Sequence, residues 1–169
     1  MTLALIHTRA LDGLQAPPVV VEVHVANGLP AFSLVGLADA EVREARDRVR
    51  AALLSSGFEF PARRITVNLA PADLPKDSGR FDLPIALGLL AASGQLPALN
   101  LQDYEFAGEL SLTGSLRPVR GALALALASH QAGRTLILPD ASGAEAALAE
   151  GVIHRAPPAR GREPAPGPA

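Results

Sequence analysis

The sequence contains no cysteine and no tryptophan, and it has only one tyrosine, Tyr104, and one lysine, Lys76. The absence of cysteine excludes disulfide bridges, cysteine-based metal sites and a cysteine nucleophile. Because aromatic residues make up 4% of the chain, its core must be built from Leu, Val, Ile and Ala. With 169 residues, 49% of them hydrophobic and 19% charged, the composition predicts a globular domain with one sizeable core.

Long apolar segments are also missing. The longest apolar run, residues 83–92, contains Pro84 and is too short to span a bilayer. The first residues lack the basic start and long apolar region of a signal peptide. The four histidines lie far apart, without the spacing of metal ligands. We therefore expect a soluble, cytoplasmic protein with no histidine-bound metal.

Charge is unevenly distributed along the chain. The net charge is −2, and residues 1–150 hold 12 basic and 16 acidic side chains. Residues 43–80, in contrast, hold eight basic and five acidic side chains, a local net charge of +3. This local excess is smaller than that of an obvious nucleic-acid-binding domain.

Strands and helices alternate after an antiparallel start. Alternating β-branched residues and turn signals such as Asn27-Gly28 predict strands over residues 3–8, 19–25, 31–35, 64–69, 105–110, 116–119 and 135–138. Helices are expected from an Asp39 cap to Gly57, from an Asp82 cap to Gly94, over 122–131, and from a Ser142 cap to about Ala149.

The second of these helices is apolar on every side, which predicts that it lies at the centre of the domain. The pattern favours an α+β fold, a mixed α/β sandwich, formed by one domain over residues 1–155. Residues 156–169 are rich in proline and predict a disordered tail or linker.

Three stretches, Gly28–Leu53, Asn68–Gly94 and Gly108–Gly121, resemble the N-terminal domain of the ComM/YifB family of magnesium-chelatase-like competence proteins. The resemblance implies the fold of the Lon protease domain, which is shared with domain 2 of ribosomal protein S5. It also implies a downstream AAA+ ATPase domain, assembly into hexamers and a role in DNA recombination during natural transformation.

The ATPase motor of that family is not found in these residues. No G-x-x-x-x-G-K-[ST] phosphate loop occurs in the sequence. The ATP and magnesium that the resemblance implies are therefore assigned to the missing AAA+ domain. We expect no cofactor in this chain.

Proteolysis of the Lon type requires a serine nucleophile and a lysine base. The resemblance places the serine position on Arg80 and the lysine position on Leu123, neither of which can perform that chemistry. A displaced dyad of Ser78 and Lys76 is the alternative, although a turn-forming loop explains both residues equally well. The sequence therefore predicts a non-catalytic domain.

Three arginines, Arg43, Arg46 and Arg50, lie on one face of the predicted first helix. They form either a solvated surface, partly neutralised by Asp47 and by pairs such as Glu44–Arg48, or a binding surface. In the second case they would act with the remaining candidate contact residues, which are Arg63, Arg64, Lys76, Arg80, Arg117 and Arg120.

Such arginines suit phosphates of a DNA backbone or carboxylates of a neighbouring subunit. Two functions follow. The first is an accessory domain that contacts DNA. The second is a structural domain that orders subunits in a ring, and its partners are further copies of this chain and the AAA+ domain of the same protein. We favour a combination of the two. Asp73, Asp77 and Asp82 also permit a metal site, but their irregular spacing favours turn and cap roles.

Overall fold

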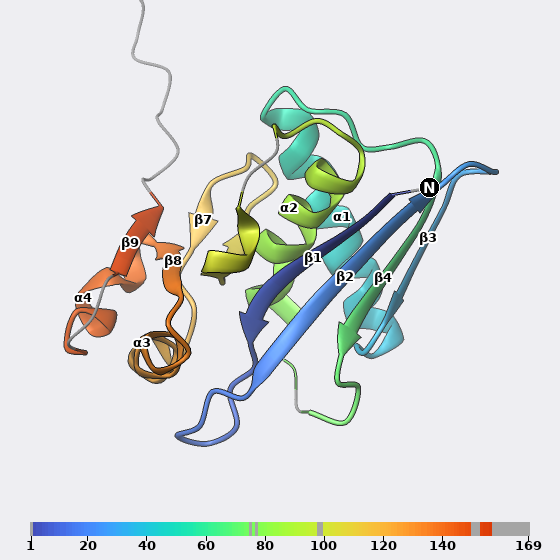
Figure 1. Cartoon of the computed structure of the whole chain (residues 1–169). Coiled ribbons are helices and arrows are strands. Elements are labelled where there is room, and N and C mark those ends of the chain that lie inside the picture. The colour runs from blue at the N-terminus through green and yellow to red at the C-terminus, as the bar shows by residue number, and fades with distance from the viewer. Residues whose placement is uncertain (1, 75, 77, 98–99, 150–152, 157–169) are drawn as a thin grey trace, which may run out of the picture.

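A computed structural model describes residues 2–74, 76, 78–97, 100–149 and 153–156 (Figure 1). The main elements are, in chain order, β1 (Thr2–Arg9), β2 (Pro18–Ala26), β3 (Ala31–Val35), α1 (Asp39–Ser55), β4 (Arg64–Ala70), η1 (Ser78–Phe81), α2 (Asp82–Ala92), η2 (Leu101–Asp103), β5 (Tyr104–Phe106), β6 (Glu109–Leu110), β7 (Leu116–Arg117), α3 (Ala122–Gln131), β8 (Thr135–Pro139), η3 (Asp140–Ser142), α4 (Gly143–Ala146) and β9 (Ile153–Ala156).

Seven strands form one mixed sheet in the order β3-β4-β2-β1-β5-β8-β9. Strand β2 runs antiparallel to both of its neighbours, β1 and β4, and the other neighbouring pairs are parallel. Strands β6 and β7 form a separate antiparallel hairpin. The predicted mixed α/β fold with an antiparallel opening is therefore confirmed.

Helices α1 and α2 lie together over the β1–β2–β4–β3 part of the sheet (Figure 1), where α2 packs against β1 and β2. Burial of α2 extends to eight of its 11 residues, which confirms the prediction of a central helix. Gly88 makes this close packing possible, because a Cβ atom there would lie 2.5 Å from Cγ2 of Val23.

A second hydrophobic cluster lies beside the first and is formed mainly by α3, α4 and β8. Leu125, Leu136 and Leu138 are its largest fully buried side chains. The segment that links the two clusters includes residues 104–110, which leave β5 and enter β6. No helix in the described part of the chain combines the length and apolarity needed to cross a membrane.

Most predicted elements are confirmed to within about one residue at each end, but two of the predicted helix caps are not. Ala38 caps α1 and Phe81 caps α2, so the predictions of Asp39 and Asp82 as caps are wrong. Ser142 precedes α4 as predicted, but its hydroxyl accepts a hydrogen bond from Val119 N–H rather than capping the helix.

Four other boundaries differ from the predictions. The strand predicted over residues 116–119 ends at Arg117 as β7. The predicted strand 105–110 divides into β5 and β6, because Ala107 and Gly108 turn the chain away from the main sheet. Helix α4 ends at Ala146 rather than near Ala149. Strand β9, which the sequence did not predict, pairs in parallel with β8 and ends at Ala156. The Pro-rich residues 157–169 lie outside the described residues.

Candidate functional site

The three stretches that carry the family resemblance meet at the carboxylate of Asp82. Arg48 of the first stretch donates from Nε and one terminal nitrogen to its two oxygens, at 2.7 and 3.2 Å. Leu110 of the third stretch donates its backbone N–H to the same carboxylate at 3.1 Å. The second stretch contributes Asp82 itself, so one side chain connects α1, α2 and β6.

Asp82 is fully buried, and this position determines its protonation. Burial raises the pKa of Asp82 from 3.8 to about 6, while Arg48 and the Leu110 N–H act in the opposite direction. The hydrogen bond to Asp82 raises the pKa of Arg48. At neutral pH the pair is therefore ionic, with Asp82 inside the core and Arg48 at its margin.

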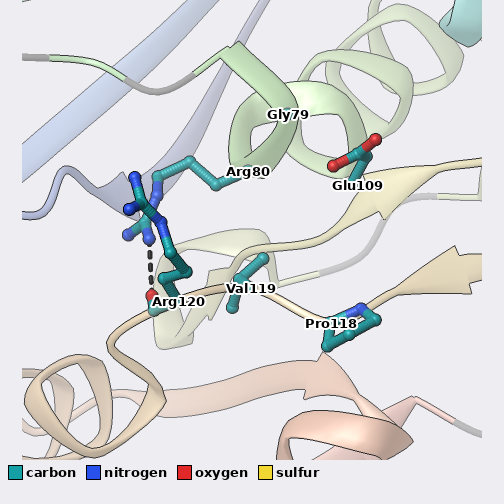
Figure 2. Close-up of a pocket in the computed structure, with 6 residues that line it drawn as sticks. All are labelled: Gly79, Arg80, Glu109, Pro118, Val119 and Arg120. Carbon is teal, nitrogen blue, oxygen red and sulfur yellow. Dashed lines mark hydrogen bonds between the residues drawn. The ribbon is translucent and has the colours of Figure 1, made fainter.

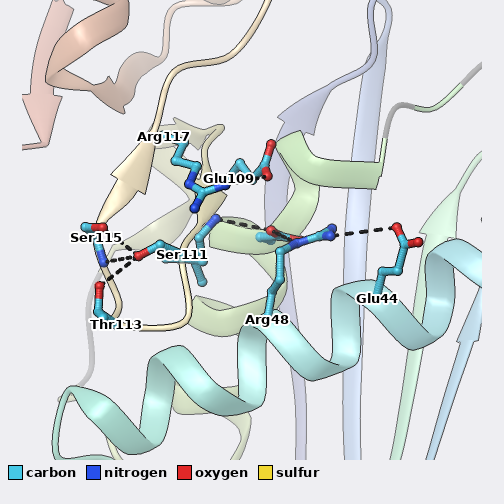
Figure 3. A network of polar contacts seen from close by, with 9 residues as sticks. Glu44, Arg48, Glu109, Ser111, Thr113, Ser115 and Arg117 are labelled. Atoms are coloured by element: carbon cyan, nitrogen blue, oxygen red, sulfur yellow. Dashed lines mark hydrogen bonds and ion pairs between the residues drawn. The ribbon is translucent and has the colours of Figure 1, made fainter.

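Arg48 belongs to a larger polar network that reaches the surface (Figure 3). Glu44, one turn earlier on α1, lies 3.9 Å from the guanidinium, which confirms the predicted Glu44–Arg48 pair. Arg117 and Glu109 form a further ion pair across the β6–β7 hairpin, with 4.0 Å between their charged atoms. The first of these two ion pairs lies within α1 and the second within the hairpin, and the hairpin contacts α1 through the Ser55 hydroxyl, which donates to Leu112 C=O at 2.9 Å.

A short backbone ladder fixes the segment around Arg80 against β6. Gly108 N–H donates to Arg80 C=O at 3.1 Å, and Leu83 N–H donates to Gly108 C=O at 3.0 Å. Glu109 packs closely over Gly79, where a Cβ atom would lie 2.6 Å from a carboxylate oxygen of its side chain. The ladder therefore sets where the Arg80 side chain can point.

Arg80 lines a pocket of about 140 Å³ whose other walls are Gly79, Glu109, Pro118, Val119 and Arg120 (Figure 2). Although its charge would favour solvent, Arg80 is only 3% exposed. Its guanidinium donates to the backbone carbonyl of Arg120 at 2.5 Å. At the position that the resemblance assigns to a serine nucleophile, the structure thus places a large cation with a structural hydrogen bond.

The position that the resemblance assigns to the lysine base is equally unsuited to catalysis. Leu123 lies in the first turn of α3 and lines a different, largely apolar pocket together with Leu11, Leu14 and Leu127. Arg80 and Leu123 therefore do not face a common cavity among the described residues. The displaced alternative of Ser78 and Lys76 falls partly outside the described residues, because the side chain of Ser78 is among those left out.

The other predicted contact residues lie on several elements. Arg63 and Arg64 are exposed at the start of β4, and the Arg50 guanidinium lies 5.9 Å from the ring centre of Phe60. Arg43 is exposed two turns away on α1, while Arg46 is paired with Asp47 at 3.4 Å.

The remaining candidates lie elsewhere. Arg117 is paired with Glu109, Arg120 shares the pocket of Arg80, and Lys76 is half-buried in the loop before η1, where burial lowers its pKa. Among the described residues, no group of three acidic or histidine side chains is placed to hold a metal ion. Asp77, one of the three residues considered for a metal site, lies outside the described residues.

A second buried ion pair was not anticipated from the sequence. Arg9 at the end of β1 donates two hydrogen bonds to Glu105 on β5, at 2.8 and 2.9 Å. Arg134 approaches the same carboxylate at 3.3 Å, and Arg9 also donates to Ala16 C=O. The available signal was an isolated charge at the end of each predicted strand: Arg9 follows strand 3–8, and Glu105 begins strand 105–110. Such a charge needs a partner once the strand is buried.

Comparisons with known proteins agree with this architecture. Residues 21–142 match the family described as subunit ChlI of Mg-chelatase. The chain is 57% identical over 148 residues to protein YifB of Salmonella typhimurium and 55% identical over 148 residues to competence protein ComM of Haemophilus influenzae. In both cases 88% of this chain is covered, but only 29% of the relative.

The chain thus corresponds to the N-terminal part of those relatives and spans less than a third of their length. A Lon protease of Chloroflexus aurantiacus is 31% identical over 128 residues, which cover 70% of this chain and 15% of that enzyme. This weaker similarity fits the α/β fold and the Lon-like expectation for it.

Proposed function

Because this chain belongs to the ChlI family of Mg-chelatase-type proteins, of the ComM/YifB kind, we propose that it is a non-catalytic accessory domain of such a protein. It supports the assembly of copies and contributes to contact with DNA. The name of the relative ComM points to competence, so we place this role in the uptake or recombination of DNA during natural transformation. We assign the ATP hydrolysis that the family resemblance implies to the part of such a protein that this chain does not span.

The observation that carries the non-catalytic part is the burial of Arg80 at the serine position. A nucleophile must be activated by a base within hydrogen-bond reach. Arg80 has no nucleophilic oxygen and donates to Arg120 C=O, while Leu123 lines a separate apolar pocket. At the position that the resemblance assigns to the serine, Arg80 therefore connects η1 with the segment that leads into α3.

Labelling with a serine-reactive fluorophosphonate tests this proposal, because the probe modifies activated serines irrespective of substrate. Intact mass spectrometry should show no mass shift after prolonged incubation, for the wild type and for Ser78→Ala alike. A stoichiometric shift that is present in the wild type and lost in Ser78→Ala would show that Ser78 is activated, and the non-catalytic proposal would fail.

Contact with DNA, the other part of the proposal, is favoured by the exposure of one face of α1. Arg43 and Arg50 are exposed, and Arg46 keeps 41% of its side chain accessible while paired with the exposed Asp47. They recur at helical spacing, so a phosphate backbone could contact them along one line. Contacts of this kind lose affinity steeply as salt rises, because counterions are released on binding.

Fluorescence anisotropy with single-stranded, duplex and branched DNA at low salt tests this contact. The variant Arg43→Gln with Arg50→Gln should weaken binding to all three and should reduce the salt dependence. The matched control is Arg117→Gln, which removes an exposed arginine from the β6–β7 hairpin. Absence of binding to every DNA, or equal losses in both variants, would remove α1 as a DNA surface.

A further inference from the structure

Two leucines stand at the tips of tight turns, where neither contributes to the core. Leu14 is 96% exposed in the turn between β1 and β2, which is closed by hydrogen bonds between Asp12 and Gln15. Leu29 is 87% exposed in the turn between β2 and β3. Single exposed leucines are common on protein surfaces, so these two are informative only because each belongs to a larger surface feature.

Leu14 forms one wall of an apolar groove along the outer face of α3, which we term the α3 groove. Part of it is a pocket of about 310 Å³ lined by Leu11, Gly13, Leu14, Gly121, Leu123, Ala124, Leu127 and Glu145. A neighbouring pocket shares Leu14, Ala124 and Leu127 and extends the groove towards Gln131. The first pocket alone exceeds the roughly 150 Å³ that holds a benzene-sized guest in an engineered apolar cavity.

The turn 27–30, which carries Leu29, protrudes where the α3 groove is hollow, and the residues around it are basic. Leu29 and Pro30 are both exposed and form an apolar protrusion. Arg63 and Arg64, both exposed, flank it, because Ala31 N–H donates to Arg63 C=O and Ala31 pairs with Arg64 across β3 and β4.

The rim of the α3 groove is acidic where the rim of the turn is basic. Glu145 lines the groove and is exposed. Asp12 is exposed between Leu11 and Gly13, two of the lining residues. An apolar protrusion with two arginines therefore complements an apolar groove with two carboxylates in both shape and charge.

The two surfaces cannot meet within one molecule. They follow opposite ends of β2, whose nine residues span about 30 Å. Figure 1 likewise shows the β1–β2 turn beside α3 and the β2–β3 turn at the far end of the sheet. Since one chain carries both complementary surfaces at opposite ends, the occupant that fits the groove is a second copy.

We propose that the Leu29 turn of one copy inserts into the α3 groove of the next copy. The contact is head-to-tail, so repetition produces a closed ring or an open filament. This inference rests on the assembly part of the proposed function and adds the surface through which assembly occurs. It also assigns Arg63 and Arg64 to a neighbouring subunit rather than to DNA.

The absence of cysteine allows a cross-linking test without background thiols. Leu29→Cys and Leu127→Cys are prepared as separate full-length chains, mixed in equal amounts and oxidised gently. The mixture should give a disulfide-linked dimer that joins residue 29 to residue 127, several times more abundant than dimers of either variant with itself. A chain that carries both substitutions should give a ladder of higher oligomers.

The matched control is Leu112→Cys, which exposes a thiol on a different surface, since Leu112 is 59% exposed in the β6–β7 turn. Mixed with Leu127→Cys, it should give only the background level of cross-linking. If the 29–127 product does not exceed this background, the proposed contact is wrong. Light scattering of the wild type then distinguishes failure of the proposed contact from failure of the assembly proposal.

A wild-type chain that assembles in light scattering without the 29–127 cross-link retains the assembly function and loses the proposed surface. A chain that remains monomeric at every concentration and lacks the cross-link overturns both. Charge reversal gives an independent check. The variant Arg63→Glu with Arg64→Glu should weaken association about tenfold or more, and a partner with Asp12→Arg and Glu145→Arg should restore it. Failure of this rescue would contradict the assigned charge pairing.

Discussion

Removal of the Arg48 guanidinium should destabilise the fold strongly at alkaline pH and much less at acidic pH. The substitution Arg48→Met keeps most of the aliphatic stem but leaves the Asp82 carboxylate with only the Leu110 N–H as a donor. Asp82 is completely buried, so its negative charge would lose its compensating cation. Breaking a buried ion pair in this way costs about 3–5 kcal/mol, which is the loss expected at pH 8.

Protonation of Asp82 reduces that cost. Its pKa is raised to about 6, so at pH 5 about nine-tenths of the side chain is already neutral in the wild type. Only hydrogen bonds to a neutral carboxyl group are then lost, which costs about 1–2 kcal/mol. The same raised pKa means that protons favour the folded state. The contribution of Asp82 to stability is complete below pH 3.8 and is lost as the pH rises through about 6.

Urea unfolding of both chains at pH 5 and pH 8 measures the difference directly. The matched control is Arg46→Met, because Arg46 lies on the same helix but pairs with exposed Asp47, and such surface pairs contribute at most about 1 kcal/mol. Equal losses for the two variants would contradict the structural role of the Arg48–Asp82 ion pair. An Arg48→Met loss that is the same at both pH values would contradict the raised pKa of Asp82.

Three further substitutions test other parts of the structure by urea or thermal unfolding. Gly88→Ala should cost about 1–3 kcal/mol, because its Cβ would lie 2.5 Å from Val23, whereas the same change in an open helix stabilises; a gain in stability would contradict the close packing of α2. Arg80→Ala should cost about 2 kcal/mol through loss of a buried side chain and its hydrogen bond, while Arg117→Ala, exposed at 63%, should stay within about 0.5 kcal/mol; similar losses would count against the structural role of Arg80. Glu105→Gln should cost about 3–5 kcal/mol, because the buried Arg9 loses its carboxylate partner; a loss below about 1 kcal/mol would show that the pair is solvated.

The sequence predicted the strands and helices well where local pattern determines them. Alternation in β2 and helical spacing in α1 depend only on which face each residue presents, so both were placed to within a residue. Gly57 was also placed correctly. It has a φ of +85° and follows α1, where the Gly57 and Phe58 N–H groups donate to Leu54 and Leu53.

The roles of charged residues could not be predicted in the same way, because their partners are distant in sequence. Asp82 looks like a helix cap in isolation, and only the approach of α1 from 34 residues away makes it the partner of Arg48. One signal was present: a carboxylate at the start of a wholly apolar helix enters the core and needs a cation there. Arg80 was similarly predicted as a candidate contact residue, but it is buried and donates to Arg120 C=O.

Strand β9 could not be predicted from the local sequence. Residues 153–156 have no long apolar run, and their strand conformation depends on pairing with β8. The family resemblance, in contrast, predicted the fold without depending on local pattern, and its three stretches are the segments that meet at Asp82.

The proposed function gives this domain no catalytic site of its own and a role in binding. The most direct measurement is cleavage of casein and of an unstructured fluorogenic peptide by the purified chain, followed by mass spectrometry, with Ser78→Ala in parallel. We expect no cleavage above the buffer level for either protein. Cleavage by the wild type that disappears in Ser78→Ala would contradict it.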